Sequence, residues 1–219
     1  ASCLVGSEMC IRDRLNNMSI SHRSSEDLGG KIPKLNITID KQADINISPN
    51  LKERINWAIQ KPTKFLKIEG DTICSQKKAA EIKEREWGNK MISQTNNGQW
   101  TTLLGENLVY DVLTLKNENP RKVKPREGFK PDWETDTHIY EVKTSNFNVS
   151  GTAGEKVLGT FIKYQNIPKL YGKPLRIVCV AYQEYELEYG KTRYFGENVT
   201  DKTKQLLELA KTWEIEYIR

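Results

Sequence analysis

The stretch FKPDWETDTHIYEVKTS (residues 129–145) decides the fold class that we expect for this chain. Residues 137–144 predict a strand, and successive side chains of a strand point to opposite faces of its sheet. Glu141 and Lys143 would therefore lie side by side on one face, while the apolar residues that alternate with them face a core. Asp132 follows a proline near the start of a hairpin that would fold it back beside Glu141. The stretch predicts two carboxylates and an ammonium group gathered on one hairpin.

These three side chains together suit one kind of chemistry. The carboxylates of Asp132 and Glu141, with a backbone carbonyl such as that of Val142, form a set of hard oxygen ligands for Mg²⁺. The Lys143 ammonium beside them can orient a water and help to stabilise a pentavalent phosphorus. Such a set is typical of metal-assisted phosphodiester hydrolysis. A structural alternative stays open, in which Glu141 and Lys143 are an exposed charge pair on an edge strand.

The segments around the hairpin predict an α/β fold with a mixed sheet. Residues 101–115 have the pattern of a helix that is apolar on two sides, which is expected of a helix packed between two layers. Downstream we expect a second helix over 154–167 that stops at Pro168, a strand opening the run 174–188, a helix over 201–213 capped by Thr200, and a final strand over 214–219.

The part before residue 100 is expected to form a small, mainly helical N-terminal region over 31–99. Residues 4–14 resemble the translation of a sequencing adapter, so we expect 1–14 to be an artefact, with a true start at Met18 or outside the sequence given. Residues 15–30 have the composition of a disordered segment. The following segments predict a weak hairpin over 34–48, a helix opened by Ser48 and Pro49, and a charged helix over 76–92. The core that carries the hairpin would span 100–219, and its end at Arg219 is expected to be a truncation.

Composition excludes several classes of function. No apolar run approaches the length of a membrane span. Cys74 and Cys179 are too far apart in the sequence to suggest a zinc site. Two separated cysteines fit a reducing cytosol, so we expect an intracellular protein. With only His22 and His138, and no GxxxxGK[ST] loop, a hydrolytic triad and a P-loop are both disfavoured. The net charge is +5, and residues 116–130 hold six basic and two acidic side chains, which either solvate a loop or attract phosphates.

The motif residues resemble the PD-(D/E)xK nuclease superfamily. The match is carried by Pro131-Asp132 and by Glu141-Val142-Lys143, within a helix–hairpin–helix–strand order that extends from about 101 to 187. The resemblance implies a restriction-endonuclease-like core, with a central mixed sheet flanked by helices. It also implies that Asp132 and Glu141 hold Mg²⁺ and that Lys143 acts on the attacking water. Many members carry a first-helix glutamate near the metal, and Glu106 matches that position.

Within the superfamily the chain is most similar to type II restriction endonucleases. Lys156, Thr160 and Lys163 recur at i, i+4 and i+7 on one helix face, which would suit a DNA backbone. Asn146 and Asn148 lie in a polar loop after the motif lysine, where short side chains could reach base edges. A solvated helix face and a plain surface loop are equally compatible with these two patterns.

The function that we expect is that of an Mg²⁺-dependent endonuclease acting on double-stranded DNA. The chain has one motif, and a duplex cut needs two sites related by two-fold symmetry, so a homodimer is expected. A restriction enzyme would also have a cognate DNA methyltransferase encoded nearby. Two alternatives remain open, namely a repair or recombination nuclease of the same fold and a DNA-binding module that does not cleave.

Overall fold

The computed structural model describes residues 48–64, 73–148, 157–191 and 193–219. The predictions for residues 1–30 and for the hairpin after them lie outside these ranges, as does Lys156. Among the described residues, no helix combines the length and the apolar character needed to cross a membrane.

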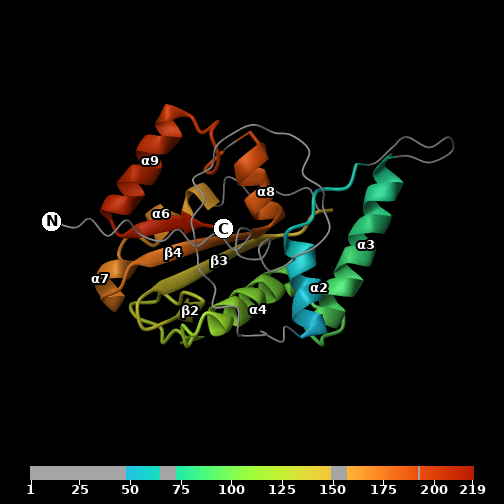
Figure 1. The fold of residues 1–219 in the computed structure, drawn as a ribbon, viewed down its shortest axis with the longest axis horizontal. Coiled ribbons are helices and arrows are strands. Elements are labelled where there is room, and N and C mark those ends of the chain that lie inside the picture. Colours follow the sequence, from blue (N-terminus) through green and yellow to red (C-terminus); the bar gives the residue numbers. More distant parts are fainter. Residues whose placement is uncertain (1–47, 65–72, 149–156, 192) are drawn as a thin grey trace, which may run out of the picture.

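A five-stranded mixed sheet lies at the centre of the fold (Figure 1). Its strands follow the chain order, and β1, β2 and β3 are antiparallel neighbours, whereas β3, β4 and β5 run parallel. The strands are β1 (Arg121–Lys122), β2 (Trp133–Glu134), β3 (Ile139–Ser145), β4 (Leu175–Ala181) and β5 (Ile215–Ile218). The prediction of an α/β fold with a mixed sheet is therefore confirmed.

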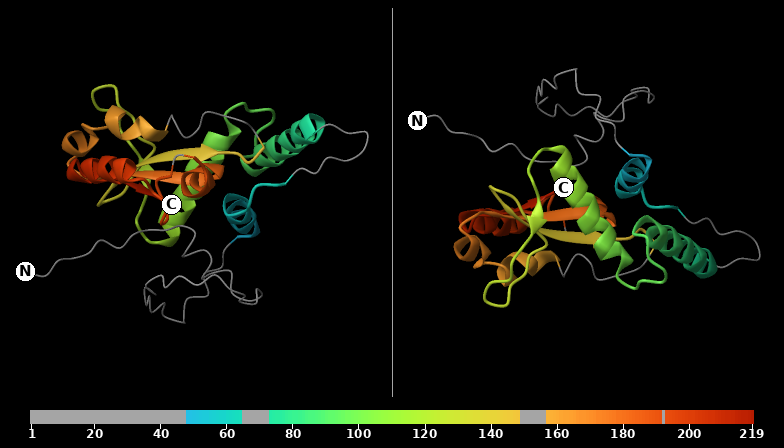
Figure 2. Two further views of the ribbon diagram at one scale, coloured as in Figure 1. Left: turned by 90° about the horizontal axis from the view of Figure 1, so that it is seen from above. Right: turned by 90° about the horizontal axis from the view of Figure 1, so that it is seen from below.

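The helices cover both faces of this sheet. On one face α4 (Trp100–Leu115) lies across β3 and β4, with α2 (Pro49–Ala58) and α3 (Ile73–Met91) packed against it (Figure 2). The other face is covered by a second apolar cluster, which includes residues from α6 (Thr160–Lys163), α7 (Ile167–Tyr171), α8 (Tyr182–Tyr189) and α9 (Asp201–Thr212).

The two-sided helix of the sequence corresponds to α4, and it is buried as predicted. Leu104 and Leu108 have no exposed area, and neither do Val109 and Leu113 on the other stripe. At Gly105 the helix meets β3 directly, because a Cβ atom there would lie 1.8 Å from Thr144 Oγ1. The close approach places the start of α4 next to the strand that carries the motif.

The helix α2 begins as the sequence predicts, whereas α3 begins at Ile73, before the predicted start at residue 76. Ser48 caps α2 by accepting a hydrogen bond from Leu51 N at 3.2 Å. Trp57 is buried, and its ring lies 5.6 Å from that of Trp87 and 6.1 Å from that of Trp100. These aromatic residues therefore fill a local core between α2, α3 and α4.

Two predictions for the second half of the chain are wrong. The helix expected over 154–167 is not continuous in its described part, because residues 157–158 and α6 are followed by turn residues 164–166, and Pro168 lies in the first turn of α7 instead of ending a helix. A proline fits the first turn of a helix because its missing N–H has no intrahelical acceptor there. The run after β4 turns at Ala181, with φ of 61°, directly into α8, which was not predicted. By contrast, the Thr200 cap of α9 and the final strand are confirmed.

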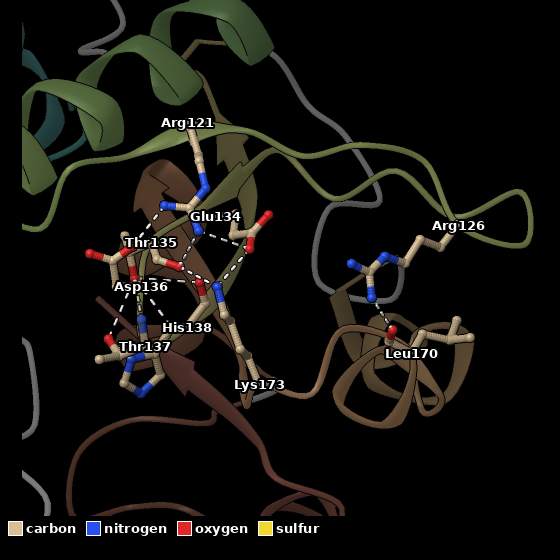
Figure 3. Close-up of polar contacts among 9 residues, drawn as sticks. All are labelled: Arg121, Arg126, Glu134, Thr135, Asp136, Thr137, His138, Leu170 and Lys173. Carbon is tan, nitrogen blue, oxygen red and sulfur yellow. Dashed lines mark hydrogen bonds and ion pairs between the residues drawn. The ribbon is translucent and has the colours of Figure 1, made fainter.

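Salt bridges connect the strands β1 and β2 at the antiparallel edge of the sheet with the residues next to them. Arg121 reaches Asp136 at 2.8 Å and Glu134 at 3.1 Å, and Lys173 reaches Glu134 from the other side at 2.6 Å (Figure 3). Lys173 lowers the pKa of Glu134, and Arg121 lowers that of Asp136, through these contacts. Four of the six basic residues in 116–130 bind groups of the protein itself: Lys116, Arg121, Lys122 and Arg126. Most of the basic side chains in 116–130 therefore make contacts within the protein.

Candidate active site

The β2–β3 hairpin brings Asp132 to the motif strand. The Asp132 N–H donates to the Tyr140 carbonyl at 3.0 Å, and the Val142 N–H donates to Asp132 Oδ2 at 2.7 Å. The backbone pairing of β2 with β3 ends at Trp133 and Tyr140. Beyond this pair, the Asp132 side chain accepts the Val142 N–H in place of a backbone carbonyl. These two bonds fix the Asp132 carboxylate beside Glu141, as the sequence predicts.

Glu141 is an unusually buried carboxylate, with 5% of the residue exposed. Tyr140 and Val142 pack into the cluster under α4, so Glu141 and Lys143 project from the opposite face of β3. Lys143 Nζ donates to Glu141 Oε1, whereas Glu141 Oε2 is buried with no hydrogen-bond partner among the described residues. A buried carboxylate oxygen without a partner is costly, so this atom is a strong acceptor for a cation or a polar hydrogen.

The two carboxylates repel each other in this setting. Burial and then the charge of Glu141 raise the pKa of Asp132 to about 7, while the Val142 N–H bond and the Lys143 charge oppose the rise. A neighbouring positive charge favours the ionised form of both groups. An additional cation beside Asp132 and Glu141 would therefore stabilise the ionised form of both carboxylates.

The donor set at the site fits a hard divalent cation. Asp132 and Glu141 supply carboxylate oxygens, and Val142 adds a carbonyl that points toward β2, because the N–H and C=O of one strand residue point to the same side. Oxygen donors of this kind are the usual ligands of Mg²⁺. No group of three or more acidic, histidine or cysteine side chains in the described ranges is arranged to hold a metal.

Glu106 lies near the pair without joining it. It comes from α4, its Oε2 accepts from Lys122 Nζ at 3.0 Å, and its backbone carbonyl accepts from Trp133 Nε1 at 2.9 Å. Its charge contributes to the raised pKa of Asp132, which shows that it is within electrostatic range. In this arrangement Glu106 could act on a metal only indirectly, for example through a water.

The proposed DNA-contacting helix face is only partly present. Lys163 is exposed, and its Nζ lies 4.9 Å from the centroid of the Tyr164 ring. Thr160 is only 3% exposed, so its side chain packs inside the protein and does not form a surface with Lys163. Of the three residues of the predicted i, i+4, i+7 face, Lys156 lies outside the described residues and Thr160 is buried, so Lys163 is the one that the structure shows at the surface.

The loop after β3 is tied to the N-terminal helices through a residue that sequence reasoning missed. Glu84 of α3 is 8% exposed and accepts from Trp57 Nε1 at 2.9 Å and from Phe147 N at 2.9 Å. Its other oxygen accepts from Asn148 N at 3.1 Å and from Asn148 Nδ2 at 2.7 Å. The Asn148 amide nitrogen, predicted to face DNA bases, is instead bound to a carboxylate of the protein, while Asn146 is half-buried.

Two further residues lie near the site. Cys179 is 1% exposed, lies opposite Lys143 in the β3–β4 register, and has a pKa raised by burial, as expected of an inert buried thiol. Tyr164 was not singled out from the sequence, although Lys143 Nζ lies 6.0 Å from the centroid of its ring. Neither Glu84 nor Tyr164 belongs to a recognisable motif, so no sequence signal marks them.

Comparison with known proteins gives no family model, no curated protein and no solved structure that matches the chain, so its function has to be inferred from the site itself.

Proposed function

We propose that the chain is an Mg²⁺-dependent DNA endonuclease of the PD-(D/E)xK type. The observation that carries the proposal is the hydrogen bond from Val142 N to Asp132 Oδ2. This bond places one carboxylate beside a second, buried one, whose other neighbour is the Lys143 ammonium. Two carboxylates and a lysine in this order along one hairpin are the groups that metal-assisted phosphodiester hydrolysis uses.

Each residue then has a distinct role. Asp132, Glu141 and the Val142 carbonyl would hold Mg²⁺, whose charge would stabilise the negative charge of the scissile phosphate. Lys143 orients the attacking water and stabilises the negative charge that grows on the phosphate oxygens. Glu106, paired with Lys122, contributes an outer negative charge.

A type II restriction endonuclease is the first candidate, with a cognate methyltransferase encoded nearby. A repair or recombination nuclease is the second, because the Asn148 amide is held by Glu84 and is not directed outward to read bases. A binding module without activity is disfavoured, because both carboxylates and the lysine are present and close together.

Digestion of unmethylated phage DNA, with Mg²⁺ or with EDTA, tests the proposal. Discrete fragments with constant ends support a restriction enzyme, and fragments with random ends support a repair nuclease. DNA binding without any Mg²⁺-dependent cleavage would leave only the binding module.

We further propose that the active form on duplex DNA is a homodimer, since one chain carries one site. Mixing wild-type protein with excess Asp132→Asn protein should form heterodimers that cut one strand, so nicked circular plasmid should accumulate. If linearisation only slows and nicked circles do not build up, a stable dimer is excluded.

We expect Lys163→Ala to weaken DNA binding uniformly across sequences. The lysine is exposed beside the proposed site, and one lost phosphate contact should weaken binding several-fold and lower the slope of log K against log salt by about one. Fluorescence anisotropy with two unrelated duplexes over a salt series measures both quantities. Lys202→Ala, at an exposed position on α9, is the matched control and should leave the slope unchanged. An unchanged slope for Lys163→Ala would remove this residue from the DNA contact.

A further inference from the structure

Tyr164 is a buried tyrosine held firmly next to the candidate site. It directly follows α6 and is 7% exposed. Its N–H donates to the Thr160 carbonyl at 3.0 Å, and its own carbonyl accepts from Ile167 N at 2.9 Å. The ring packs against Phe129, with centroids 6.0 Å apart. Backbone and ring are therefore both fixed, and the hydroxyl has little freedom to move.

The ring of Tyr164 lies close to two ammonium groups. Lys143 Nζ is 6.0 Å from the ring centroid, and Lys163 Nζ is 4.9 Å from it. A cation within about 6 Å of an aromatic ring is attracted by the negative charge of the ring face. The Tyr164 ring is thus in cation–π range of both Lys143, in the motif, and Lys163, which is exposed on α6.

Tyr164 lies beside the carboxylates of the site, because Lys143 Nζ, which donates to Glu141 Oε1, is 6.0 Å from the centroid of its ring. After burial, the Glu141 carboxylate is the main cause that raises the pKa of Tyr164, and Asp132 adds to it. A tyrosine hydroxyl with an ordinary pKa of about 10 is already protonated at neutral pH, so it can act as a hydrogen-bond donor toward a carboxylate. Glu141 has one oxygen bound by Lys143 and the other without a hydrogen-bond partner among the described residues.

We propose that Tyr164 is a positioning residue, which orients the Glu141 carboxylate with its hydroxyl and the Lys143 ammonium with its ring. This proposal rests on the proposed phosphodiester hydrolysis, since it assigns Tyr164 a task in that site. Lys143 binds one Glu141 oxygen from along the strand, and Tyr164, in the layer that covers this face of the sheet, would supply a hydroxyl donor to the same carboxylate. The carboxylate is thereby kept in one orientation, with an oxygen directed to the cation.

A purely structural role for Tyr164 makes a different prediction, which Tyr164→Phe can separate. Phenylalanine keeps the packing against Phe129 and the ring beneath the lysines, and it removes only the hydroxyl. Tyr171→Phe is a matched control on the same side of the sheet. Tyr171 is also 7% exposed, and its hydroxyl donates to the backbone carbonyls of Lys124 at 2.9 Å and Phe129 at 3.1 Å.

The experiment measures single-turnover cleavage of plasmid DNA, Mg²⁺ binding by calorimetry and the melting temperature of each protein. For Tyr164→Phe we expect the cleavage rate constant to fall about tenfold, the half-saturating DNA concentration to stay unchanged and Mg²⁺ affinity to fall several-fold. Tyr171→Phe should lower the melting temperature without changing the rate constant at a temperature where it is folded. Cleavage by Tyr164→Phe within about twofold of wild type, or equal losses in both variants, would overturn the positioning role.

The two proposals fail in distinguishable ways. If wild-type protein binds Mg²⁺ but does not cleave DNA, the nuclease function fails, and the positioning role is then decided by whether Tyr164→Phe weakens Mg²⁺ binding. If wild-type protein neither binds Mg²⁺ nor cleaves DNA, both proposals are overturned.

Discussion

Asp132→Asn, Glu141→Gln and Lys143→Ala should each lower the rate of Mg²⁺-dependent DNA cleavage on the order of a thousandfold or more. The two amide variants replace a carboxylate oxygen with a neutral, weaker ligand for a hard cation. The lysine variant removes the ammonium that binds Glu141 and that, in the proposed mechanism, would face the phosphate. Single-turnover cleavage of a plasmid measures the rate, and calorimetry with Mg²⁺ should show weaker binding for the two amide variants.

The stability of these variants should differ in a way that supports the site geometry. Asp132→Asn keeps an oxygen that can accept from Val142 N and removes the repulsion between two carboxylates, so the melting temperature should not fall. Lys143→Ala leaves the buried Glu141 carboxylate without its partner, so the melting temperature should fall.

Asp136→Asn is the control on the same hairpin, because Asp136 is exposed and binds only Arg121 among the described side chains. It should keep near-wild-type cleavage. Near-wild-type cleavage by Glu141→Gln would rule out the proposed site, whatever the other variants do.

The parts of the fold that follow from local pattern were predictable. Alternation along residues 137–144 gives the two faces of β3, and a two-sided apolar pattern gives the buried α4. Ser48 and Thr200 mark helix starts, because each places a hydroxyl where it accepts an orphan N–H. The register of the hairpin then brings Asp132 to Glu141.

The parts that depend on packing between distant segments were not predictable. The alternation of apolar and charged residues over 185–189 also suits a strand, and only the turn at Ala181 and burial against β3 and β4 decide for a helix. Thr160 looked like part of a basic helix face because its periodicity assumed a long regular helix, and the structure has a four-residue α6 there. Propensity is a weak guide at such positions, since tertiary contacts override it.

The missed residues near the site show the same limit. Tyr164 and Glu84 act through contacts with residues far away in the chain, and nothing in their own neighbourhoods distinguishes them. Glu84 lies in a highly charged helix where every acidic residue looks solvated, yet it is buried and its neighbour Glu86 is exposed. Helical spacing alone cannot identify which glutamate faces a loop 63 residues away.

Glu84→Ala should be the most destabilising of the single changes considered. The carboxylate accepts from the Trp57 indole, from two backbone N–H groups and from the Asn148 amide. Removing it leaves these donors buried without an acceptor, and each such donor costs about 1–3 kcal/mol. We expect a loss of at least about 3 kcal/mol in the free energy of unfolding, a large share of the total of a typical domain. Chemical denaturation with urea measures it, and the melting temperature should fall by about 6–12 °C.

Two comparison variants make the Glu84 prediction specific to its hydrogen bonds. Glu86→Ala changes an exposed glutamate of the same helix and should alter stability by no more than about 0.5 kcal/mol. Glu84→Gln keeps one acceptor oxygen and turns the other into an NH₂ group that meets N–H donors, so it should lose nearly as much as Glu84→Ala. A Glu84→Gln protein as stable as wild type would show that volume, and not the carboxylate, matters here. If the prediction holds, the α3 carboxylate fixes the loop that follows Lys143, and the N-terminal helices belong to the same folding unit as the candidate site.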